Sequence, residues 1–187
     1  MRKRNIAMDK KARDTLKKEL GIENIMALPK LSKIVLNMGV KDVLIDKKNI
    51  EKGIEIMKEI SGQKPKITKA KKAIAGFKLR QGDSVGLMVT LRGKRMHGFF
   101  RKLVTIVFPR FKDFHGVSKV SFDGNGNYTL GFTETTVFPE IDPGKIDKIQ
   151  GLEIVIVTTA KDDKRGFALL SAMGMPFVKV KSEKSKV

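Results

Sequence analysis

A nearly unbroken run of β-branched residues at 152–158, Leu-Glu-Ile-Val-Ile-Val-Thr, most constrains how this chain can fold. Branching at Cβ restricts the side-chain rotamers and favours extended backbone, so the run predicts a strand buried in a sheet. Two further apolar runs, at 33–38 and 85–91, predict neighbouring strands, and a short strand is expected at 66–68.

Four segments have the composition or the periodicity of helices. They are residues 7–20, 46–60, 94–108 and 162–173. Asp46 and Asp162 are available as N-caps, and Pro109 is expected to end the third helix. Strands and helices alternate irregularly along the chain. This order predicts the α+β class, a two-layer sandwich with helices packed on one face of one mostly antiparallel sheet.

Turn chemistry and linkers define the domain organisation. The segment Asp-Gly-Asn-Gly-Asn at 123–127 lies between apolar flanks and predicts a hairpin, whereas residues 133–151 read as irregular. No repeat and no linker divides the chain. We therefore expect a single domain over residues 1–178, with a long, exposed basic loop at 68–84, and a basic, disordered tail at 179–187.

Positive charge is concentrated in the middle of the chain. The protein has 39 Lys and Arg against 20 Asp and Glu, a net charge of +19. Residues 61–112 hold fourteen basic residues and only one acidic residue, Asp83, a net of +13, while residues 120–163 hold three basic and eight acidic residues, a net of −5. Repulsion between like charges opposes compaction, so a polyanionic partner is the natural explanation of the basic excess.

Several functional classes lack their required residues. There is no cysteine, no P-loop, no apolar run of membrane-spanning length, and no apolar stretch behind the basic N-terminus to make it a secretory signal. The two histidines, His97 and His115, have no partner at a metal-ligand spacing. An enzyme, a cofactor and a bound metal are therefore not expected. A Mg²⁺-dependent nuclease remains an alternative, built on the carboxylates Glu134, Glu140, Asp142 and Asp147.

The aromatic content limits the kind of nucleic acid that the chain can read. Readers of single strands stack bases on exposed aromatic rings, but this chain has no Trp and one Tyr. Recognition of a folded or duplex RNA through its shape and phosphates is therefore expected. The run of seven cations in residues 61–80 is a candidate contact, namely Lys64, Lys66, Lys69, Lys71, Lys72, Lys78 and Arg80. A general RNA chaperone would use the same lysines and remains an alternative.

A series of long motifs resembles one known family. They are KIVLNMGV at 33–40, ISGQKPKITKAKKAIAGFKLRQG at 60–82, VTLRG at 89–93, SFDGNGNYTLG at 121–131, FPEID at 138–142 and IVIVTTAK at 154–161. Their order and spacing resemble the bacterial form of the 5S-rRNA-binding ribosomal protein family, number five of the large subunit. The resemblance covers roughly residues 7–178.

The resemblance implies a structural role in the ribosome, in the cytoplasm or in an organelle. The family anchors 5S rRNA in the central protuberance beside other 5S-binding large-subunit proteins, and it also touches 23S rRNA. It contacts the elbow of peptidyl-site tRNA. Through an intersubunit bridge it reaches a head protein of the small subunit, ribosomal protein S-thirteen.

Residues of this chain match the family's contact positions. For 5S rRNA, the resemblance implies hydrogen bonds from Asn37, Gln63 and Thr90, with the neighbouring cations Lys64, Lys66 and Arg92. The tRNA-facing loop matches residues 68–82 and implies contacts from Lys69, Lys71, Lys72, Phe77, Lys78 and Arg80. The bridge corresponds to part of residues 109–146, and its acidic members are Glu134, Glu140 and Asp142.

The chain also departs from the family pattern. Asp83-Ser84 stands where the family commonly has an aromatic residue followed by proline, which puts the local tRNA contact in question. A bulky aromatic residue is frequent where His97 stands, and the basic tail extends beyond the usual end of the family.

Overall fold

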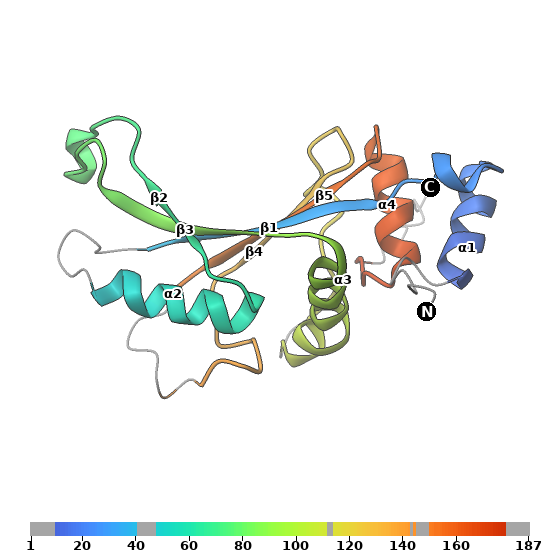
Figure 1. The fold of residues 1–187 in the computed structure, drawn as a ribbon. Coiled ribbons are helices and arrows are strands. Elements are labelled where there is room, and N and C mark those ends of the chain that lie inside the picture. The colour runs from blue at the N-terminus through green and yellow to red at the C-terminus, as the bar shows by residue number, and fades with distance from the viewer. Residues whose placement is uncertain (1–9, 41–47, 112–113, 143, 145–149, 179–187) are drawn as a thin grey trace, which may run out of the picture.

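The computed structural model describes residues 10–40, 48–111, 114–142, 144 and 150–178 (Figure 1). In this part of the chain five strands form one antiparallel sheet in the order β2-β3-β1-β5-β4. The strands are β1 (Leu31–Gly39), β2 (Lys66–Lys69), β3 (Ser84–Leu91), β4 (Tyr128–Phe132) and β5 (Leu152–Thr158). The predicted α+β class is confirmed, and the run at 152–158 is strand β5.

Alternation along the central strands gives the sheet two different faces. On β1, Ile34, Leu36 and Met38 point into the core and are almost fully buried, whereas Val35 and Asn37 between them are only partly buried. The register places Leu36 beside Val89 of β3 and Ile154 of β5, so the buried rows continue across the sheet. Each fully buried aliphatic side chain contributes about 1.5–3 kcal/mol, and these rows specify the register.

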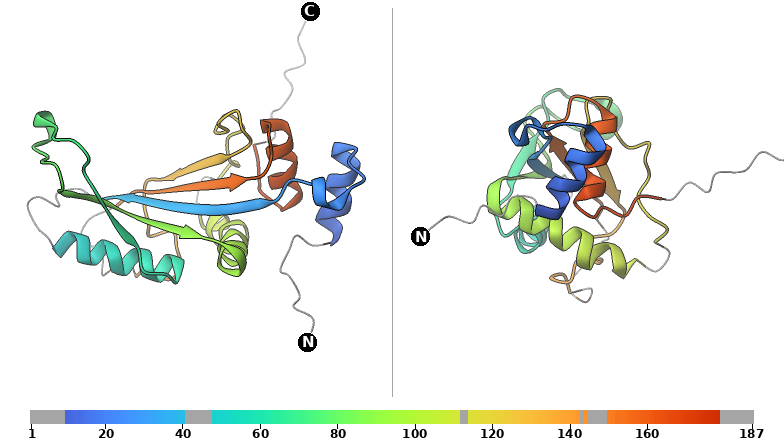
Figure 2. Two further views of the ribbon diagram at one scale, coloured as in Figure 1. Left: turned by 45° about the horizontal axis from the view of Figure 1, so that its top comes forward. Right: turned by 90° about the vertical axis from the view of Figure 1, so that its right-hand side faces the viewer.

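Four helices occupy one face and one end of this sheet. They are α1 (Lys10–Leu20), α2 (Lys48–Ser61), α3 (Gly93–Lys102) and α4 (Asp163–Ala172). Helices α2 and α3 cover the face that carries the buried rows, and α1 packs against α4 at one end of the sheet (Figures 1 and 2). In the described segments no helix combines the length and apolar character that a membrane crossing requires.

Two helix-end predictions need correction. The helical path after α3 does not end before Pro109 but continues through a π-helical turn, Leu103–Val107, and a 3-10 turn, Phe108–Arg110. Pro109 lies in the first turn of that 3-10 segment, where no backbone N–H is needed. Asp162 does occupy the N-cap position of α4, but its side chain makes no capping bond; it faces Arg165 instead, at 3.4 Å from Nε. Asp46 lies outside the described residues.

The segment 123–127 forms the predicted tight turn but only part of the predicted hairpin. Asp123 Oδ1 accepts the backbone N–H groups of Asn125 and Asn127, and the side-chain amide of Asn127, which also donates to Asp123, lowers the pKa of that carboxyl. The flank before the turn contributes an isolated bridge from Phe122 to Tyr128 rather than a strand. Strand β4 pairs with β5 instead.

The basic segment 68–84 is more ordered than the long loop that the sequence suggests. It leaves the sheet between β2 and β3 and projects beyond it (Figure 1). Ile74 and Leu79 exchange backbone hydrogen bonds of 3.0 and 3.2 Å, and a 3-10 turn at Ala75–Phe77 closes the tip. Lys78 has a left-handed backbone, with φ of 51°, as the reversal of the chain requires. We call residues 68–84 the arm.

Candidate nucleic-acid interface

The face of the sheet opposite α2 and α3 carries the polar residues singled out from the sequence; we call it the open face (Figure 1). Asn37 on β1 lies directly beside Met88 of β3, and Thr90 lies two residues further along β3, so both side chains belong to this face. Both are partly buried. An amide and a hydroxyl can each donate and accept hydrogen bonds, as contacts to sugars and bases require.

Cations flank these two polar residues on the same face. Lys66 of β2 pairs with Met88, and the extended backbone at Arg92 continues the alternation of β3 beyond Thr90. Lys66 and Arg92 are exposed, and among the described residues neither makes an ion pair. The structure therefore brings together four of the six residues assigned to 5S rRNA, and leaves their positive charge available to phosphates.

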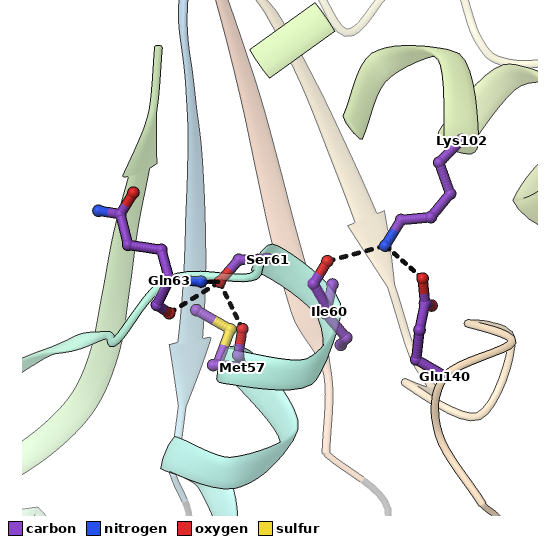
Figure 3. Close-up of polar contacts among 6 residues, drawn as sticks. All are labelled: Met57, Ile60, Ser61, Gln63, Lys102 and Glu140. Carbon is purple, nitrogen blue, oxygen red and sulfur yellow. Dashed lines mark hydrogen bonds and ion pairs between the residues drawn. The ribbon is translucent and has the colours of Figure 1, made fainter. Parts of the chain in front are cut away.

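The other two, Gln63 and Lys64, lie at the edge of the sheet, in the short connection between α2 and β2. Ser61 fixes this connection: its hydroxyl accepts the N–H of Gln63 at 3.1 Å and lies 2.6 Å from the carbonyl oxygen of Met57 (Figure 3). Gln63 points away from the helix end, and its Oε1 accepts a hydrogen bond from Arg95 at 3.3 Å. Gln63 is thus held in place through its backbone, while its side-chain nitrogen has no partner in the described residues.

The arm carries the cations assigned to tRNA. Lys69, Lys71, Lys72, Lys78 and Arg80 are all exposed. Backbone hydrogen bonds from Ala70 to Asp83 (2.7 Å) and from Gly82 to Ala70 (3.0 Å) close its base. The backbone of Phe77 lies in the turn at the tip; its side chain lies outside the described part. The arm therefore presents positive charge on a hydrogen-bonded frame that projects beyond the sheet (Figure 1).

Two of the three acidic bridge residues line one small groove. Glu140 and Asp142 lie there opposite Glu55 and Glu59 of α2, around a volume of about 110 Å³. Two lysines offset part of the negative charge of this groove. Lys52 of α2 also lines it, and Lys102 Nζ binds Glu140 Oε1 at 2.7 Å and donates to the carbonyl of Ile60 at 2.8 Å (Figure 3).

The third bridge residue, Glu134, does not line this groove; its Oε2 accepts a hydrogen bond from Thr136. The described segments contain no group of three or more side chains able to hold a metal ion, and Asp147 lies outside them.

The two histidines differ in environment. His97 is partly buried on α3; burial lowers its pKa below the ordinary value, and the nearby Arg101 guanidinium adds to this effect. His115 is exposed in a loop. Neither lies on the open face.

Comparison with known proteins adds an independent line of observation. Residues 24–80 match the family "Ribosomal protein L5", and residues 84–177 match the model of the C-terminus of the same ribosomal family. Relatives named large ribosomal subunit protein uL5 include one from Anaeromyxobacter sp. (strain Fw109-5), 54% identical over 90% of this chain and 94% of its own. Another, from Streptococcus suis (strain 05ZYH33), is 56% identical over 88% of this chain and 91% of its own.

The chain belongs to the ribosomal protein L5 family. It is therefore a structural, non-enzymatic component of the large ribosomal subunit. As an L5 family member it works in association with rRNA and other ribosomal proteins, which accounts for the excess of positive charge. The resemblance inferred from the motifs is confirmed over most of the chain.

Three residues of this L5 family member acquire roles that the sequence alone did not reveal. Glu55 and Glu59 extend the acidic groove, and their i, i+4 spacing on an amphipathic helix was the available signal. Asp83, which the departure from the family pattern linked only to the tRNA contact, accepts the backbone N–H of Arg80 at 2.8 Å and so takes part in the frame of the arm. Its carboxylate thus has a partner within the protein.

Proposed function

We propose that the open face binds 5S rRNA and that this contact anchors the protein in the central protuberance. The observation that carries the proposal is the gathering of Asn37, Thr90, Lys66 and Arg92 on the one sheet face that no helix covers. Cations on such a face attract phosphates without regard to sequence, whereas the amide and hydroxyl supply directional hydrogen bonds. Gln63 adds a second amide at the edge.

Competitive binding tests this proposal. Labelled 5S rRNA is bound at physiological salt and displaced by unlabelled 5S rRNA or by an equal mass of an unrelated folded RNA. We expect a preference of about a hundredfold or more for 5S rRNA, as is usual for a specific site over non-specific binding. If both competitor RNAs displace the labelled RNA equally well, and still do so when the other 5S-binding proteins are present, the general RNA chaperone is favoured instead.

The arm is proposed to contact the elbow of peptidyl-site tRNA. Its exposed cations, Lys69, Lys71, Lys72, Lys78 and Arg80, lie on a segment that projects from the sheet, so the arm can reach a second RNA while the open face is occupied. Phe77 at the tip is proposed to pack against the tRNA. A further contact with 23S rRNA is proposed for the remaining basic surface.

The acidic groove is proposed to form the intersubunit bridge with a basic head protein of the small subunit, S-thirteen. Glu140 and Asp142 lie together with Glu55 and Glu59, and Glu134 would join them from the neighbouring loop. Opposite charges on the two proteins would favour this contact. Charge reversal at Asp142 (Asp142→Lys) should weaken subunit association, and a matching reversal on the partner should restore it.

A further inference from the structure

A hollow of about 710 Å³ lies where β1 and β4 end and β5 begins. Six of its nine lining residues follow the outward alternation of these strands or directly flank them, namely Asn37, Gly39, Gly131, Thr133, Gly151 and Glu153, so most of the hollow is open to the open face; the other three are Phe132, Gln150 and Leu152. This volume lies within the usual range of small-molecule sites, about 300–1,000 Å³. The hollow is therefore large enough for one unstacked base of an RNA.

Two glycines keep this hollow open although the fold does not need them. A Cβ added to Gly39 or Gly131 would meet no atom within 4 Å, and neither residue has a positive φ. Gly86 on the same face is different, because its Cβ would lie 2.6 Å from the carbonyl oxygen of Met38. Glycine weakens a strand and often marks the close approach of a ligand. Gly39 and Gly131 fit the second description, since the space above them is open to a ligand.

One wall of the hollow is a polar pair on adjacent strands. Asn37 and Glu153 are directly opposite in the register, and Asn37 Nδ2 donates to Glu153 Oε2 at 3.2 Å. The second amide hydrogen of Asn37 has no partner in the described residues. The pair thus offers one donor beside carboxylate acceptors.

A carboxylate at this place requires an explanation. Glu153 is exposed on a face whose cations, Lys66 and Arg92, attract phosphates, and it makes no ion pair with any described residue. The negative charge of Glu153 repels phosphates. The RNA groups that it can attract are therefore hydrogen-bond donors. Guanine carries two adjacent donors, N1–H and N2–H, next to the acceptor O6 on its Watson–Crick edge. A donor beside two acceptors complements that edge, as cytosine does.

We infer that the hollow takes one unstacked guanine of the bound RNA, whose Watson–Crick edge is read by Asn37 and Glu153. The carboxylate accepts N1–H and N2–H, Asn37 donates to O6, and the base lies over Gly39 and Gly131. Lys66 lies on the same cross-strand row as Asn37, two strand spacings or about 10 Å away, so it can hold a phosphate of the same stretch of RNA. This inference rests on the proposed binding of 5S rRNA to the open face.

A conservative variant of Glu153 tests the inference, because simple electrostatics and recognition of guanine predict opposite changes in the affinity for 5S rRNA. If the carboxylate is only tolerated, Glu153→Gln removes a negative charge beside phosphates and tightens 5S rRNA binding. If it reads guanine, the same change weakens binding about tenfold or more, since it removes one acceptor of a paired contact. Glu51→Gln, an exposed carboxylate on α2 at the opposite face, is the matched control and should leave the affinity unchanged.

Two further measurements identify the base and the hollow. Kethoxal, which reacts with N1 and N2 of unpaired guanines, should show one guanine of 5S rRNA that the wild-type protein protects and Glu153→Gln does not. Inosine at that guanine lacks the N2 amino group and should weaken binding to the wild type but not to Glu153→Gln. A Cβ at Gly131 has no atom within 4 Å, so Gly131→Val should narrow the hollow and weaken binding about tenfold at an unchanged melting temperature.

The outcomes separate this inference from the proposed function. A wild-type preference for 5S rRNA that survives in Glu153→Gln and Gly131→Val overturns the guanine site and leaves the open face as the binding surface. Protection of no guanine, or equal protection by wild type and Glu153→Gln, also overturns it. A wild-type protein without preference for 5S rRNA overturns both.

Discussion

The carboxylate of Asp83 accepts a hydrogen bond from the backbone N–H of Arg80, 2.8 Å away, where the arm returns to the sheet. The carbonyl of Asp83 accepts the N–H of Ala70 from the other side of the arm. One residue therefore joins the two sides of the base. The acidic residue that interrupts the family pattern has an internal structural function in this chain.

Removal of that carboxylate should loosen the arm without unfolding the domain. An intramolecular hydrogen bond contributes about 1 kcal/mol, so in Asp83→Ala the amide of Arg80 should exchange with solvent about fivefold faster. Asp83→Asn keeps an acceptor oxygen and should retain most of the protection. Amide hydrogen exchange measured by NMR checks this, and identical exchange rates in Asp83→Ala and wild type would contradict it.

Hydrogen-bonding residues and charged residues of the open face and its edge should affect RNA binding in different ways. Asn37→Ala and Gln63→Ala should each cost about 1–3 kcal/mol of 5S rRNA binding, because an RNA group loses its partner. The dependence of affinity on salt should not change. With about five phosphate contacts, the slope of log affinity against log salt should be roughly −3.5 to −4.5.

Lys66→Ala provides the contrast. Loss of one phosphate contact should make that slope shallower by about 0.7–0.9. Titrations of wild type and the three variants at several salt concentrations measure both quantities. A change of slope in Asn37→Ala, or an unchanged slope in Lys66→Ala, would mean that the two classes of contact are assigned wrongly.

Cations of the arm should be dispensable for 5S rRNA. Lys71→Ala combined with Lys72→Ala should leave the affinity for 5S rRNA almost intact, because both residues lie on the segment that projects from the sheet. The same double variant should reduce crosslinking of the assembled large subunit to peptidyl-site tRNA. A large loss of 5S rRNA affinity would show that the arm contacts 5S rRNA and that its assignment to tRNA is wrong.

Stability should fall in mild acid because of His97. Burial lowers the folded-state pKa of His97, so the unfolded chain binds its proton more readily. This contribution is fully present above the ordinary histidine pKa of about 6.5 and is lost as the pH falls through the lower folded value. Urea unfolding at pH 7 and at pH 5 measures the change. In His97→Phe the difference between the two pH values should shrink, and an undiminished difference would exclude His97 as its source.

Lys102 connects α3, α2 and the loop that carries Glu140. Its ammonium group also lies 5.5 Å from the ring centre of Phe99 and 5.8 Å from that of Phe138. Lys102→Met keeps the length of the side chain but leaves the carbonyl of Ile60 without this donor, so it should destabilise the domain by about 1–2 kcal/mol. Glu140→Gln should cost less than about 1 kcal/mol, as a partly exposed ion pair does. Urea unfolding of both variants tests this order, and the reverse order would show that the ion pair dominates.

Local chemistry allowed the sequence to predict the elements that depend on it. The β-branched run at 152–158 and the apolar spacing in α2 each have one simple structural solution. The turn at 123–127 was also evident, but its packing was not: a Cβ on Gly126 would lie 2.7 Å from that of Ala160 and 2.8 Å from the carbonyl oxygen of Asp162. That contact joins residues far apart in the chain, and no local pattern encodes it.

Long-range geometry also explains what was missed in the candidate site. Asn37 and Thr90 were assigned through the family resemblance, because neutral side chains beside a basic run carry no signal of their own. The pairing of Asn37 with Glu153 and the hollow beside it depend on strand order. The role of Asp83 in the arm was not predicted, because the sequence does not show that its carboxylate meets a backbone N–H three residues earlier.

Strand β3 runs without a break from the base of the arm at Ser84 to Thr90 on the open face. At about 3.4 Å per residue, this stretch sets a distance of roughly 20 Å between the two regions. If the open face and the arm bind two RNAs as proposed, the length of β3 sets the distance between those RNAs. A two-residue insertion would keep every side chain on its face yet move the two regions about 7 Å further apart, so the two proposed contacts would constrain the length of the strand as well as its side chains.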